Sequence, residues 1–189
     1  MTTQKIKVGI CGLGTVGRGV IALLSEGGDV LSNRVGGTIE LVHVATRTPK
    51  PEVDTLGARD SRDVFDVARD PNVDVLIELI GGTTVAKGLV VEALKQGKHV
   101  VTANKALLAD HGDELFALAE SKGVALRFEA AVAGGIPVIE AVKTSLAGNH
   151  VSSVAGIING TGNFILTEMA AKGREFSDVL AEAQALGYA

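Results

Sequence analysis

Short apolar runs alternate along this chain with longer segments whose apolar residues recur every three or four positions. The runs have the length and the Val and Ile content of buried strands, and the spacing of the longer segments is typical of helices that pack through one face. Regular alternation of the two predicts an α/β fold on a parallel sheet. The predicted strands are residues 6–11, 39–46, 73–80, 98–102 and 124–130.

Glycine and short polar residues indicate where the intervening helices begin and end. A first helix over residues 15–25 is closed by Gly27, and Ser61 is placed to cap a short helix that ends near Arg69. Two further helices are predicted over residues 84–96 and 113–122, each stopped by a following glycine.

After residue 130 the pattern becomes less regular. A helix opened by residues 134–137 is predicted to run to about residue 147, and residues 151–158 are predicted to form a strand of a second sheet. Residues 163–171 have a helical pattern, and Ser177 is placed to cap a last helix. We therefore expect a second, smaller body after the first sheet.

Composition narrows the class of protein. Hydrophobic residues make up 46% of the chain and aromatic residues only 3%, so the core must consist of aliphatic side chains, as is usual for a buried parallel sheet. The net charge of −4 and the lack of a Lys/Arg run argue against nucleic acid and membrane surfaces as partners. No apolar run approaches the ~20 residues of a membrane span, and the N-terminus has no apolar leader. We expect a soluble cytoplasmic protein.

The first predicted strand leads into the pattern G-x-G-x-x-G, which reads Gly12-Leu13-Gly14-Thr15-Val16-Gly17. In a dinucleotide site the first glycine makes the turn, the second lets a pyrophosphate approach the backbone, and the third lets the helix pack on the strand. A glycine-rich loop without a ligand is the alternative. The strand before the pattern and the helix after it are the context that coenzyme binding requires, so we predict a nicotinamide dinucleotide site at these six residues.

The end of the second predicted strand bears on the choice of coenzyme. An NAD site usually carries Asp or Glu there, whereas this chain has Arg47, with Lys50 close behind it. A guanidinium can pair with the 2′-phosphate of NADP, so the sequence favours NADP(H). Arg47 could instead be a solvated loop residue, and use of NAD stays possible.

Two more loops reach the same edge of the predicted sheet, because the carboxyl ends of parallel strands line one crevice. Thr83 and Thr84 could contact ribose or phosphate, although Thr84 could equally be only a helix cap. Lys105 follows the fourth strand, where an ammonium could stabilise a developing alkoxide. The alternative for Lys105 is a solvated side chain.

Several longer blocks resemble homoserine dehydrogenases. They are GLGTVG at 12–17, ELIGG at 78–82, VTANKA at 101–106, EAAVAGGIP at 129–137, NGT at 159–161 and EAQALGYA at 182–189. The resemblance runs in order along essentially the whole chain. The block at 129–137 and the Asn104–Lys105 pair are much more specific than the glycine pattern.

The resemblance implies NAD(P)H-dependent interconversion of aspartate 4-semialdehyde and L-homoserine, a step in threonine, isoleucine and methionine biosynthesis. It implies that Lys105 contacts coenzyme and substrate and takes part in catalysis, that Gly187 lines the coenzyme site, and that the protein is a homodimer. It also implies a sodium ion held mostly by backbone carbonyls, at Glu129, Val132, Gly134 and Ile136. The Glu129 carboxylate could instead be satisfied by backbone N–H groups.

Two departures from the family pattern matter. Gly162 stands where the family usually has threonine, which loosens a turn and removes a hydroxyl. The glutamate, aspartate and second lysine that follow the closing block in the family, and that bind substrate and donate the proton, are not in this sequence. The resemblance therefore implies a Rossmann domain over residues 1–133 and an incomplete α+β substrate and dimerisation domain over residues 134–189. We expect this chain alone to bind NADP(H) weakly or not at all, with little or no turnover.

Two other functions fit parts of the pattern. Another Rossmann-type amino-acid dehydrogenase would share the first half but needs a different segment where residues 129–137 lie. A non-catalytic dinucleotide sensor would keep the glycine turn but has no use for Lys105 or the cation loop. The one cysteine, Cys11, excludes an intramolecular disulfide and is expected to be a small buried residue.

Overall fold

The computed structural model describes residues 4–157 and 159–187. Contacts divide the chain into two compact units, Met1–Val142 and Lys143–Ala189. No helix within the described residues is long and apolar enough to cross a membrane.

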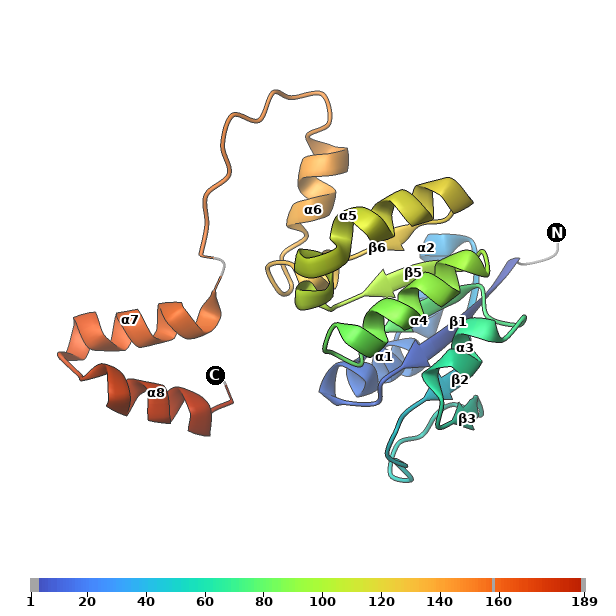
Figure 1. Cartoon of the computed structure of the whole chain (residues 1–189), viewed down its shortest axis with the longest axis horizontal. Coiled ribbons are helices and arrows are strands. Elements are labelled where there is room, and N and C mark those ends of the chain that lie inside the picture. Colours follow the sequence, from blue (N-terminus) through green and yellow to red (C-terminus); the bar gives the residue numbers. More distant parts are fainter. Residues whose placement is uncertain (1–3, 158, 188–189) are drawn as a thin grey trace. The chain divides into compact units, whose positions relative to one another are not determined.

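The first unit is built on a sheet of six parallel strands (Figure 1). Their order is β3-β2-β1-β4-β5-β6, so the chain starts in the middle, winds outward to one edge, and returns to build the other half. This is the doubly wound topology, and it confirms the predicted fold class. The strands are β1 (Gln4–Cys11), β2 (Gly37–Ala45), β3 (Arg59–Ser61), β4 (Val75–Glu78), β5 (His99–Thr102) and β6 (Leu126–Arg127).

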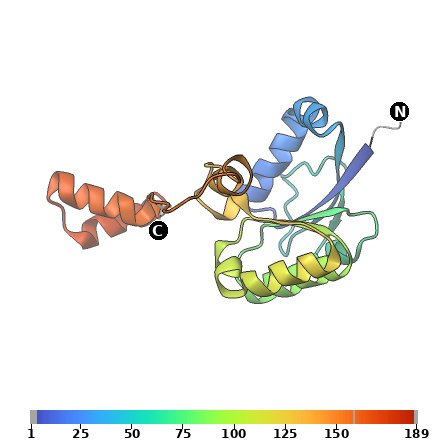
Figure 2. The same cartoon turned by 90° about the horizontal axis from the view of Figure 1, so that it is seen from above.

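Helices cover both faces of this sheet, as Figure 2 shows. One side carries α1 (Thr15–Glu26) and α2 (Gly28–Val35), and the other carries α3 (Val64–Arg69), α4 (Thr84–Lys95) and α5 (Lys105–Lys122). After β6 come the 3-10 turn η1 (Glu129–Ala131), the short helix α6 (Val138–Glu140) and the π-helical turn η2 (Ala141–Ser145). The second unit contains the helices α7 (Gly160–Lys172) and α8 (Phe176–Ala185). These two helices pack against each other, with Ile165, Val179 and Ala183 buried between them.

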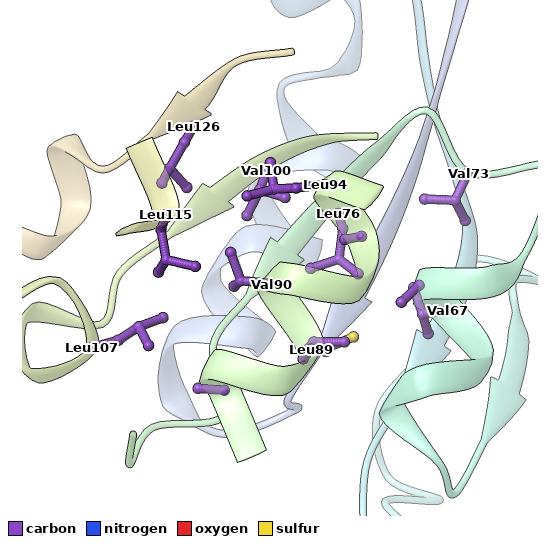
Figure 3. Close-up of a cluster of buried hydrophobic side chains, with 14 of the residues drawn as sticks. Val67, Val73, Leu76, Leu89, Val90, Leu94, Val100, Leu107, Leu115 and Leu126 are labelled. Atoms are coloured by element: carbon purple, nitrogen blue, oxygen red, sulfur yellow. The ribbon is translucent and has the colours of Figure 1, made fainter. Parts of the chain in front are cut away.

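Aliphatic side chains fill the space between sheet and helices on each face, as the composition predicts. The larger cluster joins β4 and β5 to α3, α4 and α5, with Leu76, Leu89 and Leu94 wholly buried at its centre (Figure 3). The opposite face buries Val8, Ile10, Leu13, Ile21, Leu41 and Val44. Each such side chain contributes about 1.5–3 kcal/mol when it is fully removed from water, so the two clusters supply most of the driving force for folding.

Several helix starts differ from those predicted. Ser61 ends β3, and Asp63 caps α3 by accepting a hydrogen bond from Phe65 N at 2.9 Å. Helix α5 begins at Lys105 rather than near residue 113, because Asn104 caps it through Leu107 N at 3.0 Å. Several polar residues lie near each helix start, and any of them could accept hydrogen bonds from the first N–H groups of the helix. The sequence alone did not show which one does.

Three other helix starts also differ from the prediction. Thr83 rather than Thr84 stands at the N-cap of α4, with no side-chain cap bond, so the cap role considered for Thr84 is wrong. Asn159 caps α7, which therefore begins at Gly160 rather than at residue 163. Helix α8 begins at Phe176 after Glu175, so Ser177 is not its cap.

Three further differences concern strands and a missed helix. Strands β4 and β6 are shorter than predicted, and the sequence analysis overlooked β3 and α2. Residues 151–157 form no strand; residue 158, the end of that prediction, lies outside the described residues. An isolated extended segment has no ladder to satisfy its N–H and C=O groups, and the described residues offer it no neighbouring strand. Val154 and Ile157 are 69% and 74% exposed.

A buried polar network ties β2 to the loop after α3. The ring of His43 is wholly buried, with Nδ1 2.7 Å from Asp70 Oδ2 and Nε2 3.0 Å from Ser61 Oγ. Lys98 Nζ donates to the carbonyls of Asp70 and Val73 at 2.6 and 2.8 Å. Partial burial of Asp70 opposes its ionisation, but hydrogen bonds from Asn72 and His43 outweigh that effect and lower the pKa of its carboxyl.

Replacing Asp70 by Asn is expected to lower the free energy of unfolding at pH 7 by about 1–3 kcal/mol, because a buried ring then loses a charged acceptor. The pKa of Asp70 is lower in the folded chain than in the unfolded chain. Its stabilisation is therefore full above the unfolded pKa, about 3.9, and is lost as pH falls through the folded pKa. Urea denaturation of both proteins from pH 7 downward should show their stabilities converging in acid, and a constant gap would contradict this assignment.

Gly17→Ala is expected to destabilise the first unit by about 1–3 kcal/mol or more, because the new methyl would lie 2.0 Å from the carbonyl oxygen of Gly12. Gly19→Ala is the matched control in the same helix, since a methyl there meets nothing within 4 Å. That variant should be more stable than the wild type, by about 0.5–1 kcal/mol. Thermal unfolding of the three proteins measures both effects, and equal stability of the two variants would refute the packing role of Gly17.

Candidate functional site

A cavity of about 570 Å³ opens at the carboxyl ends of the central strands. It lies where β1 and β4 are neighbours although they come from different halves of the sheet. Ligands of open α/β sheets bind at this point, because the connections after the two strands leave to opposite sides. Gly12, Leu13 and Gly14 line the cavity on one side, and Leu79, Ile80 and Gly81 line it on the other.

The glycine turn has the geometry that its pattern predicts. Gly12 has a φ of +104°, and a Cβ there would lie 2.5 Å from the Leu79 carbonyl oxygen. Its N–H donates to Ala45 O at 2.8 Å, which ties the turn to β2. Gly14 stands at the N-cap of α1 with no side-chain cap, and a Cβ there would meet nothing within 4 Å. The first N–H groups of α1 therefore remain available to an anion.

Cationic side chains gather at the β2 end of the same cavity. Arg47 and Lys50 both line it, as the sequence analysis expects of a 2′-phosphate site. Arg62 lines it too, and was missed because it follows β3, a strand too short to show a pattern. Its guanidinium forms a fork with Asp60 at 2.6 and 2.9 Å and donates to Thr46 O at 3.2 Å.

Other predicted coenzyme residues lie outside the lining of this cavity. Thr15 and Val16 are exposed at the start of α1, and Gly17 is buried against Gly12. Thr83 and Thr84 stand at the beginning of α4, where Val85 is the residue that reaches the cavity. Their contact with a coenzyme stays a prediction.

Lys105 is the exposed first residue of α5. Its ammonium forms no hydrogen bond or ion pair with any described residue. The side chain of the preceding residue, Asn104, donates to Gly82 O at 2.7 Å. The start of α5 is thus held beside the loop that walls the cavity, although Lys105 itself is not part of the lining.

The four residues of the predicted sodium site lie in one loop after β6. The carboxylate of Glu129 accepts hydrogen bonds from Ile139 N and Glu140 N at 3.0 and 2.9 Å, so it serves the start of α6. The backbone carbonyls of Glu129 and Ile136 each accept one backbone N–H, which leaves a second lone pair on each oxygen. Ala133 and Gly134 adopt positive φ, at 57° and 60°, and turn the loop tightly. Carbonyl oxygens in such a loop suit a hard cation.

Two residues named in the sequence analysis remain, Gly187 and Cys11. Gly187 lies in the second unit, after α8, so its contribution to coenzyme binding stays a prediction. Cys11 is wholly buried at the end of β1, and burial raises the pKa of its thiol far above neutral pH. A thiol in that state is not a nucleophile, which confirms its expected structural role.

Comparison with known proteins agrees with this geometry. Residues 12–129 match the family model for the homoserine dehydrogenase NAD-binding domain, and residues 137–189 match that for homoserine dehydrogenase. The homoserine dehydrogenase of Pseudomonas aeruginosa is 58% identical over 186 residues, which are 98% of this chain and 43% of that protein.

Solved structures show the same relationship. A homoserine dehydrogenase from Thiobacillus denitrificans superposes with a TM-score of 0.93 at 49% identity, over 99% of this chain and 44% of that one. A hyperthermophilic archaeal homoserine dehydrogenase in complex with NADPH shares the fold, with a TM-score of 0.83 at 24% identity over 98% of this chain and 62% of that one. This chain spans about 43% of the length of its Pseudomonas relative. The two family models together cover most of its residues, and the chain belongs to the homoserine dehydrogenase family.

Proposed function

We propose that this chain forms the coenzyme-binding part of an NAD(P)H-dependent enzyme that interconverts aspartate 4-semialdehyde and L-homoserine. The observation that carries the proposal is the cavity at the end of β1, where a glycine turn and an uncapped helix start face a cationic rim. Free N–H groups and the positive end of α1 match the two phosphates of a dinucleotide. Membership of the family supplies the reaction.

NADP(H) is the coenzyme that the rim supports best. Arg47, Lys50 and Arg62 line one end of the cavity. Asp63, the acidic residue in the lining, already accepts the N–H of Phe65. The NADPH bound to the archaeal relative is consistent with this choice. Arg62 is already paired with Asp60, so Arg47 and Lys50 are the two cations of the rim that favour a coenzyme with an added phosphate over one with a free ribose hydroxyl.

Lys105 is proposed as the residue that contacts both coenzyme and substrate. A bound nicotinamide dinucleotide supplies the hydride that reduces the aldehyde carbon. The ammonium of Lys105 would stabilise the charge that develops on the aldehyde oxygen. A cation at the positive end of a helix is unfavourable by about 0.3–1 kcal/mol, so helix stability does not account for a lysine there. This placement favours an enzyme over a non-catalytic sensor.

Three parts of the proposal rest on the family alone. A sodium ion would be held by carbonyl oxygens of Glu129, Val132, Gly134 and Ile136, since the Glu129 carboxylate is engaged at α6. A homodimer would form through the substrate and dimerisation domain, which we place from residue 134 onward. A cytoplasmic location goes with the biosynthesis of threonine, methionine and isoleucine.

The sequence analysis left open whether this chain binds coenzyme weakly or not at all. Because the first unit contains every residue that lines the cavity, we now expect weak but measurable binding. Gly14→Ala tests the site directly. A methyl there is free of contacts in the protein, so the free energy of unfolding should change by less than about 1 kcal/mol. The same methyl would stand where the pyrophosphate lies, so NADPH binding should fall at least about tenfold. An NMR titration with millimolar NADPH measures this, and unchanged binding by a folded Gly14→Ala variant would disprove the site.

Arg47→Ala should weaken NADPH binding by about tenfold and leave NADH binding unchanged, because only NADPH carries the phosphate that the guanidinium would meet. Arg34→Ala, on the exposed surface of α2, removes the same charge away from the cavity and should change neither affinity. Equal losses for the two coenzymes would show that Arg47 does not read the 2′-phosphate.

A further inference from the structure

A chain of buried hydrogen bonds links the carboxyl ends of β4 and β5. Glu78 and Thr102 are the last residues of these strands, lie opposite each other in the sheet, and are wholly buried. Thr102 Oγ1 donates to Glu78 Oε2 at 2.6 Å and accepts from Asn104 N at 3.0 Å. Glu78 Oε1 accepts from Ile80 N at 2.9 Å. The sequence analysis assigned no role to the side chains of Glu78, Thr102 and Asn104.

Every polar side-chain atom of Glu78 and Thr102 takes part in these hydrogen bonds. Both oxygens of Glu78 accept, one from a backbone N–H and one from a hydroxyl. A glutamine there would place an N–H donor at one of these two positions, so the Thr102 hydroxyl would have to accept a hydrogen bond from it instead of donating one. The Thr102 hydroxyl donates a hydrogen bond to Glu78, and a lone pair on its oxygen accepts from Asn104 N. A buried carboxylate is costly unless it is satisfied in this way.

One end of this series of hydrogen bonds fixes the backbone of a loop that lines the coenzyme cavity. Gly81 lines the cavity, and Gly81 and Gly82 adopt positive φ of 71° and 70°. Glycine has more conformational freedom than any other residue, so hydrogen bonds from outside this turn restrict where its backbone lies. Glu78 holds the N–H of Ile80 just before this turn, and the Asn104 amide holds the carbonyl of Gly82 at its end.

The other end of this series of hydrogen bonds fixes the first residues of α5. Asn104 Oδ1 accepts from Leu107 N at 3.0 Å and caps the helix. The next residue is Lys105, whose backbone position is set by that cap. The side chain of Asn104 thus uses its oxygen for the helix and its nitrogen for the cavity wall.

We propose that Glu78, Thr102 and Asn104 are positioning residues that hold the Gly81–Gly82 turn against the coenzyme and place Lys105 beside it. The proposal rests on the proposed function, since it needs a coenzyme in the cavity. A role limited to stability would place the same bonds in the core but would not affect coenzyme affinity in variants that remain folded.

Asn104→Asp separates the two roles. The aspartate keeps the oxygen that caps α5 but replaces the donor to Gly82 O with an acceptor. The matched control is Asn159→Asp, because Asn159 caps α7 in the same way, through Gly162 N at 2.6 Å, in the second unit. Both variants should keep a cooperative thermal transition. NADPH affinity should fall at least about tenfold in Asn104→Asp and should not change in Asn159→Asp.

A second variant excludes charge repulsion as the cause. Thr102→Val removes the hydroxyl that joins Glu78 to Asn104 and adds no charge. It should weaken NADPH binding several-fold at temperatures where it is folded. Repeating the Asn104→Asp titration at about 0.05 and 0.5 M salt gives a further check, because repulsion of the phosphates is screened and misplacement of the turn is not.

The outcomes are distinct. Weaker binding by folded Asn104→Asp and Thr102→Val proteins, retained at high salt, supports the positioning role. Wild-type affinity in both folded variants overturns it and leaves the proposed function standing. A wild-type chain that shows no response to millimolar NADPH or NADH overturns both.

Discussion

The close contact between the glycine turn and its neighbours determines the layout of the first unit. At the end of β1 the N–H of Gly12 bonds to β2, and its Cα faces the Leu79 backbone beyond β4 too closely to admit a Cβ. Leu79 N in turn donates to Cys11 O at 2.8 Å. Three strands therefore meet at one point, and α1 leaves from it with Gly17 pressed on the same turn. The cavity and the free start of α1 are consequences of this packing.

Charge is distributed around that point in two different ways. Arg47 and Lys50 lie at the rim, where long side chains can follow a ligand and remain hydrated. Glu78 lies inside, wholly buried, and its charge is matched by hydrogen-bond donors rather than by a cation. Under the proposed function, the rim cations would attract an anionic ligand, whereas the buried Glu78 carboxyl group restricts where the backbone can lie. The site needs both, because attraction without a fixed wall would not orient the nicotinamide.

Side chains that cap helices have a second effect in this protein. Asn104 joins α5 to the cavity wall, and Glu129 joins the loop after β6 to α6. Because the Glu129 carboxylate is engaged in this way, a cation bound to that loop would depend on carbonyl oxygens. Each cap therefore ties the end of one strand to the start of a helix, and residues for which we propose a function stand at these junctions.

Features set by neighbouring residues could be read from the sequence. Periodicity and turn chemistry act over a few residues, so the α/β class, the glycine turn and the cationic end of the cavity at Arg47 were all predictable. The start of α5, the approach of Arg62 and the bond from Thr102 to Glu78, 24 residues apart, depend on which strands are neighbours. Residues 151–157 show the same limit, because their pattern suits a strand but a strand needs a partner. Only the tertiary structure decides which distant groups share a hydrogen bond.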